Sequence, residues 1–241
     1  GQINGTTGYV EAACQGLMAG INASLRVQEK EPLILKRSEA YIGVLIDDLI
    51  TKGTEEPYRM FTSRAEFRLS LRQDNADLRL TALGHALGLA SEERFEKMNH
   101  KKSETAKLVN DLKQKKFSPD AINAGLERLE TATITEKISA EKLLKRPQLG
   151  IKELATLSDE LAEYLTKYPN EVIEQAEIQI KYAGYIQKEF EMVSSFNRQE
   201  NLKIPVSINY QSIHSLSAEA VQKLKKVKPE TIGQASRISG V

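Results

Sequence analysis

The stretch GQINGTTGYVEAACQGLMAGINA, Gly1 to Ala23, joins scattered glycines to an apolar, alanine-rich run. Gly-Thr-Thr-Gly at residues 5–8 leaves the backbone free to approach a ligand closely. The run that follows predicts a helix from about Tyr9 to Arg26. The first N–H groups of such a helix lack partners and carry partial positive charge. The pattern therefore indicates either an anion-binding helix start or an ordinary capped helix. Gly16 and Gly20 would let this helix lie close against a neighbour.

Composition favours a folded protein without a membrane span. Of the 241 residues, 40% are hydrophobic and 28% are charged, which is enough for a core and excludes global disorder. The net charge of +1 means that attraction to nucleic acid has to come from local patches. Cys14 is the one cysteine, so an internal disulfide is excluded and a reducing, cytoplasmic compartment is expected. The three histidines are scattered and make no metal or catalytic-triad pattern.

The middle of the chain is rich in Lys and Glu and has helical periodicity. Ser91 is a candidate N-cap of a helix, and Pro119 suits the first turn of the next one. A longer helix is predicted from about Asn170, because apolar residues recur there in steps of three and four: Val172, Ala176, Ile180, Ala183, Ile186, Phe190 and Val193. This spacing predicts a helix packed along its length on a partner helix. It indicates a bundle core rather than a ligand site.

Five arginines lie close together between Arg59 and Arg79, interleaved with aromatic residues: Arg59, Arg64, Arg68, Arg72 and Arg79. Three of these arginines are four residues apart, so a helix would align them, but the alternation in Phe67–Arg72 favours a strand, paired with the apolar run Val44–Ile50. Guanidinium groups gathered on one surface suit RNA phosphates and splayed bases. The alternative is salt bridging to nearby acids, namely Asp47, Asp48, Glu55, Glu66, Asp74 and Asp77. The residues alone leave these two interpretations open.

The end of the chain is a short basic segment. Ile204–Ile208 contains Pro205 and predicts an extended connector. Ser217 is a candidate N-cap, and Pro229 is expected to open a further helix. Two short helices of this kind resemble a helix–turn–helix, so a DNA-binding module is one alternative function.

Three blocks of the chain occur in the order Gly1–Ala23, Arg37–Thr81 and Thr231–Val241. In sequence and in order, these blocks resemble the glucose-inhibited division protein A family, the flavin-dependent enzymes of tRNA wobble-uridine modification. Val10 stands where many relatives carry an acid, whereas Glu11 beside it is kept.

The resemblance implies the C-terminal portion of a longer enzyme whose dinucleotide fingerprint lies upstream of Gly1. The implied fold is mainly α, with a helical C-terminal region attached to the last elements of an α/β FAD-binding domain. The implied divisions are residues 1–85 for the end of the FAD-binding domain with the arginine-rich block, 86–203 for a helical domain, and 204–241 for a small helical module that is cut short.

The resemblance also implies an activity. With a partner GTPase, the family adds a carboxymethylaminomethyl group at C5 of the wobble uridine of tRNA. FAD is the implied cofactor, NADH the implied reductant and a folate the one-carbon donor. The implied partners are tRNA and the GTPase, which docks through the C-terminal helical region of a homodimer within a heterotetramer. The competing hypotheses are a structural helical adaptor and the helix–turn–helix module.

Site residues follow from the same resemblance. The implied FAD contacts are Gln2, Asn4, Gly5, Thr6, Thr7 and Gly8, and the implied RNA contacts are Arg59, Arg64, Arg68 and Arg72. No residue of the chain has the features of a catalytic nucleophile, general base or metal ligand. Cys14 is expected to be a small buried hydrophobe rather than a redox group. The chain alone is expected neither to hold FAD nor to be active.

Overall fold

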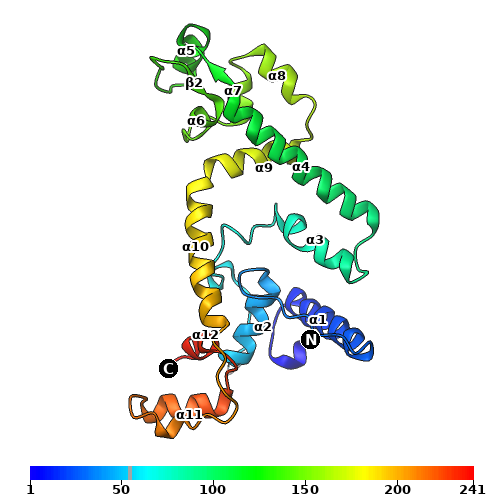
Figure 1. The fold of residues 1–241 in the computed structure, drawn as a ribbon. Coiled ribbons are helices and arrows are strands. Elements are labelled where there is room, and N and C mark those ends of the chain that lie inside the picture. Colours follow the sequence, from blue (N-terminus) through cyan, green and yellow to red (C-terminus); the bar gives the residue numbers. More distant parts are fainter. Residues whose placement is uncertain (54–55) are drawn as a thin grey trace. The chain divides into compact units, whose positions relative to one another are not determined.

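The computed structural model describes residues 1–53 and 56–241, which are almost entirely helices and connections (Figure 1). The described residues contain α-helices, short 3-10 helices (η) and one two-stranded sheet, so the prediction of a mainly α fold is confirmed. They divide into two compact units, Gly1–Leu71 with Lys188–Val241, and Arg72–Gln187. These boundaries differ from the divisions at residues 85 and 203 that the family resemblance implies. No helix within the described ranges combines the length and the apolar character that crossing a membrane requires.

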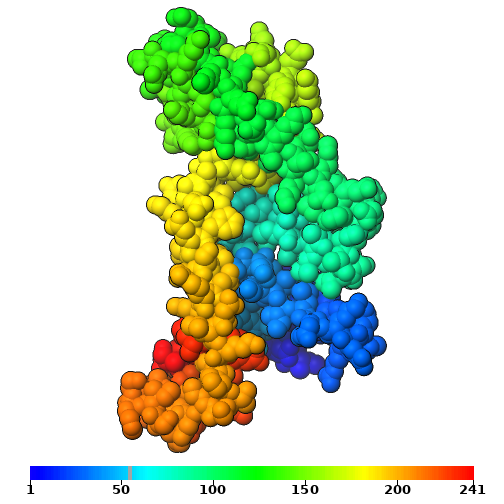
Figure 2. Space-filling model, in the orientation of Figure 1, coloured from blue at the N-terminus to red at the C-terminus, as the bar shows by residue number. Residues whose placement is uncertain are grey.

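The first unit joins the two ends of the chain. Its elements are η1 (Gln2–Asn4), α1 (Tyr9–Val27), α2 (Tyr41–Thr51), η2 (Thr62–Arg64), most of α10 (Ala183–Glu200), η3 (Tyr210–Ser212), α11 (Ala218–Val227) and α12 (Ile232–Arg237). One small core surrounds Val44 and Leu71, and another surrounds Tyr210 and Leu224. Figure 2 shows the C-terminal residues, in orange and red, gathered at one end of α10.

The second unit is built around one long helix. Its elements are α3 (Ala76–Ala86), α4 (Glu92–Gln114), β1 (Lys116–Phe117), α5 (Pro119–Arg128), β2 (Ile138–Ser139), α6 (Ala140–Leu144), α7 (Ile151–Ala155), α8 (Asp159–Leu165) and α9 (Asn170–Lys181). The strands pair antiparallel, with Lys116 opposite Ser139. Figure 1 shows α5 to α8 and the sheet gathered around the C-terminal end of α4, where leucines and isoleucines of these helices form one continuous core.

Three of the helix starts predicted from a capping serine or a first-turn proline are confirmed. The Ser91 hydroxyl accepts a hydrogen bond from the Arg94 N–H at the start of α4. Pro119 is the first residue of α5, where its missing N–H is not needed. Ser217 caps α11 by accepting from the Ala220 N–H. Each of these signals acts within one turn of chain.

The predicted strand at Phe67–Arg72 is wrong, and so is its pairing with Val44–Ile50. The apolar run forms helix α2, whose buried residues include Val44, Asp48 and Thr51 at helical spacing. The segment near Phe67 forms a turn closed by the Leu71 N–H and the Phe67 carbonyl at 2.9 Å. Glu189 of α10 accepts hydrogen bonds from the Leu69 N–H and the Ser70 hydroxyl. A carboxylate from a distant helix therefore occupies the Leu69 N–H, a backbone donor that a strand partner could have used.

Two helix predictions need correction. The apolar seam from Asn170 does not run along one helix, because α9 ends at Lys181 and α10 begins at Ala183. Val172, Ala176 and Ile180 are buried as predicted, whereas Ala183 and Phe190 are exposed. Pro229 does not open the last helix either. Lys228 ends α11 in the left-handed conformation, and α12 starts only after Thr231 caps it.

Candidate functional site at the start of α1

The Gly-Thr-Thr-Gly segment is held by backbone hydrogen bonds to Tyr58. The Tyr58 N–H donates to the Gly5 carbonyl at 2.8 Å, and the Thr7 N–H donates to the Tyr58 carbonyl at 2.9 Å. Gly5 has φ of 82°, a left-handed conformation that favours glycine. Tyr58 therefore holds the backbone of residues 5–7 in place where the chain enters α1.

Gln15 of α1 fixes the side chains of this segment. It accepts a hydrogen bond from the Asn4 amide at 2.7 Å and donates one to the Thr6 hydroxyl at 3.0 Å. Thr6 and Gln15 are buried, whereas Gln2 and Thr7 are exposed. Asn4 and Thr6 thus stabilise the turn. The exposed Thr7 also takes part, because its hydroxyl donates to the Tyr58 carbonyl at 3.3 Å, whereas the exposed Gln2 side chain lies outside this set of bonds.

A cavity of about 690 Å³ lies in front of the first turn of α1. Its lining is mostly apolar and consists of Thr7, Gly8, Tyr9, Val10, Glu11, Cys14, Tyr41, Ile42, Leu45, Arg59, Met60 and Thr62. Of the six residues expected to contact FAD, Thr7 and Gly8 line this cavity. Cys14 is only half-buried, and that burial raises the pKa of its thiol, so it is neutral at physiological pH.

Glu11 occupies the space at the helix start. Its Oε1 accepts a hydrogen bond from the Met60 N–H at 2.9 Å, and this bond lowers the pKa of the Glu11 carboxyl. A Cβ at Gly8 would lie 1.7 Å from Glu11 Oε2, so only glycine leaves room for the carboxylate. The positive end of α1 therefore already faces a negative charge from its own first turn. The sequence signal for this role is an acid three residues after the N-cap.

Gly16 and Gly20 have no close neighbour among the described residues. A Cβ added at either position would meet no heavy atom within 4 Å. The close approach predicted for these glycines is therefore not made by any described part of the chain.

The four candidate RNA-binding arginines differ in their surroundings. Arg59 and Arg68 are exposed, and among the described residues of their unit no hydrogen bond or ion pair occupies either guanidinium group. Arg64 lies over the Tyr58 ring at 4.5 Å and donates to the Arg59 carbonyl. Arg72 belongs to the second unit and pairs with Asp74 at 3.0 Å. Of the four, Arg59 and Arg68 are therefore the ones whose side chains are exposed to solvent.

The acids proposed as salt-bridge partners pair mostly with other cations. Arg37, which is 2% exposed, pairs with Asp47, Asp48 and Glu66. Lys101 pairs with Asp77. Glu55 lies outside the described residues. Nothing in the local sequence of Arg37 distinguishes a buried arginine from an exposed one, so its position among three acids could not be predicted from the sequence.

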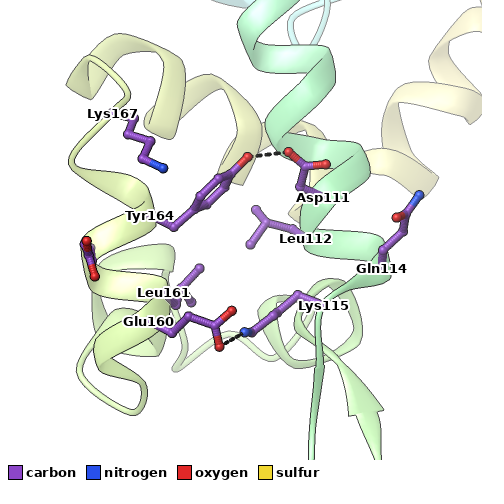
Figure 3. Close-up of a pocket in the computed structure, with 9 residues that line it drawn as sticks. Asp111, Leu112, Gln114, Lys115, Glu160, Leu161, Tyr164 and Lys167 are labelled. Atoms are coloured by element: carbon purple, nitrogen blue, oxygen red, sulfur yellow. Dashed lines mark hydrogen bonds and ion pairs between the residues drawn. The ribbon is translucent and has the colours of Figure 1, made fainter.

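A second cavity, of about 640 Å³, lies between α4 and α8 in the second unit (Figure 3). Leu112 and Leu161 form its apolar floor, and a Lys115–Glu160 ion pair bridges the two helices. The Tyr164 hydroxyl donates a hydrogen bond to Asp111. Burial of this hydroxyl, and then its bond to Asp111, raise the pKa of Tyr164. The rim carries lysines and acids together, so its charge selects no class of ligand.

Comparison with known proteins identifies the family. Residues 92–190 match the model of the tRNA modifying enzyme MnmG/GidA C-terminal helical domain, and residues 192–241 match that of its C-terminal helical bundle. Residues 1–31 match the model of glucose inhibited division protein A. Two of the three models describe helical domains, in agreement with the fold. The chain belongs to the MnmG/GidA family.

Individual relatives agree along the whole chain. The tRNA uridine 5-carboxymethylaminomethyl modification enzyme MnmG of Flavobacterium psychrophilum is 57% identical over all of this chain and 39% of its own length. The protein of the same name from Cytophaga hutchinsonii is 56% identical over the same shares. A crystal structure of Aquifex aeolicus GidA covers 100% of this chain with 44% identity and a TM-score of 0.79, and 37% of that chain is matched. The chain thus spans about two fifths of the length of these relatives.

Proposed function

We propose that this chain is part of an FAD-dependent enzyme that, with a partner GTPase, adds a carboxymethylaminomethyl group at C5 of the wobble uridine of tRNA. The observation that carries the proposal is the identity of 56–57% along the whole chain to relatives named for this modification. Within the enzyme, this part contributes one wall of the FAD site, tRNA contacts and GTPase docking through residues 204–241. NADH is the proposed reductant, and the proposed assembly is a cytoplasmic homodimer joined to the GTPase.

The cavity at the start of α1 fits one edge of a flavin. Its mostly apolar lining, which includes Thr7 and Gly8, suits a flat ring. FAD would supply redox chemistry, while Gln2, Thr7 and Gly8 would orient the ring and Asn4, Gly5 and Thr6 would hold the turn that presents them. A pyrophosphate needs a glycine-rich strand–turn–helix that the described residues lack. The chain by itself is therefore expected to purify without flavin.

A chimera tests the proposed function. In the Flavobacterium relative, the matching 243 residues are replaced by this chain, and the chimera is expressed in a strain that lacks its own modification enzyme. Nucleosides from the tRNA are then analysed by mass spectrometry. We expect the modified wobble uridine to return. A chimera that folds and retains flavin but leaves the uridine unmodified contradicts the proposal.

Gln2→Ala in the same chimera is expected to weaken FAD retention by several-fold while the helices melt unchanged. Gln2 is exposed and precedes α1, so its loss removes a polar contact without disturbing the helical core. The measurement is flavin absorbance per protein after gel filtration. Gln28→Ala, an exposed glutamine beyond the other end of α1, is the matched control. Equal flavin content in both variants removes Gln2 from the cofactor contacts.

Arg59→Ala and Arg68→Ala are each expected to weaken tRNA binding and to flatten its salt dependence by about one unit of log–log slope. Each exposed guanidinium would neutralise one phosphate and release the counterions there. Filter binding of tRNA across a salt series measures both quantities. Arg94→Ala, at an exposed position on α4, is the control.

Arg72→Ala separates the two interpretations of the arginines. Its guanidinium pairs with Asp74 at the surface, and such a pair contributes about 0–1 kcal/mol to stability. If Arg72 also binds phosphate, the tRNA slope falls as it does for Arg68→Ala. If all the variants keep the wild-type slope and melt at lower temperatures, the arginines are structural.

A further inference from the structure

Arg237 of α12 connects the C-terminal segment, residues 204–241, to helix α2. Its guanidinium forms two hydrogen bonds of 2.8 Å to the two carboxylate oxygens of Asp47. It also pairs with Glu200 of α10 and lies 5.1 Å from the centre of the Phe196 ring. The Arg237 side chain is only 11% exposed. Because all three nitrogens of the group bond to carboxylates and its side chain is mostly covered, Arg237 is placed to hold the segment rather than to contact RNA.

Asp47 is shared between two arginines. Its Oδ2 atom accepts from Arg237 Nε at 2.8 Å and from Arg37 Nη1 at 3.0 Å. The same Arg37 Nη1 donates to Asp48 Oδ1 at 2.7 Å. Arg37 and Asp48 are buried, and the side chains of Asp47 and Arg237 are only 12% and 11% exposed, so their charges interact more strongly than at the open surface. The position of Arg37 therefore depends on how much of the Asp47 charge Arg237 neutralises.

Arg37 in turn holds the segment that carries Arg59. It donates to the Arg64 carbonyl at 3.2 Å. Asp48, which Arg37 neutralises, accepts from the Tyr58 hydroxyl at 2.9 Å. The Arg64 side chain donates to the Arg59 carbonyl at 2.9 Å. Residues 58–64 are thus anchored at both ends through Arg37.

We propose that Arg237 is a positioning residue for the tRNA-facing segment 58–64. When the C-terminal segment is docked, Arg237 neutralises part of the Asp47 charge and Arg37 stays on Asp48 and the Arg64 carbonyl. When the C-terminal segment is undocked, the full Asp47 charge draws Arg37 away from Asp48 and from the Arg64 carbonyl. The contacts that hold Tyr58 and Arg64 in place are then weakened. A partner that binds residues 204–241 would therefore change the affinity for tRNA through Asp47 and Arg37. The part of this inference that concerns tRNA rests on the proposed function.

The connection itself can be tested without RNA. The protein is labelled with 3-fluorotyrosine, and the Tyr58 signal in the ¹⁹F NMR spectrum is assigned from Tyr58→Phe. Arg237→Gln is expected to shift this signal by more than its line width. Lys223→Gln is the control, because Lys223 lies in the same segment but bonds to Glu219 and the Ser239 carbonyl. A Tyr58 signal unmoved by Arg237→Gln overturns the proposal.

A double-mutant cycle tests the consequence for tRNA. In the full-length chimera, Arg237→Gln is expected to weaken tRNA binding roughly fivefold, the lower end of measured couplings between sites. In the Arg59→Ala background the same change is expected to have less than a twofold effect, because the contact that it positions is already gone. Equal losses in both backgrounds overturn the positioning role. If Arg237→Gln does not fold, Arg237→Lys replaces it. Lysine keeps the charge but cannot bond to both carboxylate oxygens of Asp47 as arginine does. The Arg237→Lys variant is expected to show the same dependence on Arg59. If Arg237→Gln shifts the Tyr58 signal but the wild-type chimera binds no tRNA, the result counts against the proposed function and not against the connection.

Discussion

Arg37→Met is expected to lower the free energy of unfolding by about 3–5 kcal/mol, the cost of removing one partner of a buried ion pair. Arg37 is 2% exposed and Asp48 is fully buried. After the change, Asp48 would keep its bonds to Lys52 and Tyr58 but lose its closest cation, at 2.7 Å. Asp47, Glu66 and the Arg64 carbonyl would lose a donor as well.

Urea unfolding followed by circular dichroism measures this loss. Arg68→Met is the matched control, because Arg68 is exposed, and surface changes of this kind usually stay within about 0.5 kcal/mol. A loss below about 1 kcal/mol for Arg37→Met would show that the remaining cations compensate for it.

The effect of Arg37→Met is also expected to depend on pH. Burial opposes the charge on Asp48, but hydrogen bonds from Lys52, Arg37 and Tyr58 outweigh it, and the pKa of this carboxyl is lowered. A lowered pKa contributes stability above the unfolded value of about 4, and that stability is lost as the pH falls through the folded value. The difference between wild type and Arg37→Met should therefore be largest near neutral pH and shrink below about pH 4. A constant difference from neutral pH down to about pH 3 would contradict this account.

Gly43→Ala is expected to destabilise the first unit by about 3 kcal/mol, the upper end of the cost of overpacking. A Cβ at Gly43 would lie 2.3 Å from the Lys36 carbonyl oxygen and 2.5 Å from that of Leu35. Both are backbone atoms, which cannot relieve the clash by a change of rotamer as a flexible side chain can. The clash should outweigh the gain of about 1 kcal/mol that alanine brings to a helix interior.

Gly16→Ala and Gly20→Ala are the controls, because both lie in α1 with no atom within 4 Å of an added Cβ. Each is expected to stabilise the chain by about 0.5–1 kcal/mol. Thermal melts of the three variants measure the contrast. If Gly43→Ala melts at or above the wild-type temperature, the segment at Leu35 and Lys36 does not pack against α2 as described.

Much of the fold could be predicted because its signals are local. Ser91, Pro119 and Ser217 each act through backbone groups within one turn, so their effect does not depend on the rest of the protein. The glycines before Tyr9 and the helix after it were found for the same reason. The family could be recognised too, since its three blocks are continuous in sequence and the family models match the first and last of them.

The incorrect predictions concern segments whose hydrogen bonds and burial depend on residues far away in the sequence. Alternation in Phe67–Arg72 is compatible with a strand, but Glu189, more than a hundred residues away, takes the donors of that segment. The seam after Asn170 keeps its period past Lys181, yet burial follows it only while α9 packs in the core of the second unit. Periodicity records which residues could share a face and carries no information on what covers that face.

By itself, the sequence determined the helical class, the helix starts, the family and the set of candidate arginines. The tertiary structure decided which arginine is buried among carboxylates, which ones face solvent, and that Glu11 occupies the start of α1. Charge and hydrogen-bonding capacity belong to each residue type and can be inferred from the sequence. Burial and pairing belong to the packed chain, because they depend on residues such as Asp47 and Arg237, which pair although they lie 190 positions apart in the sequence.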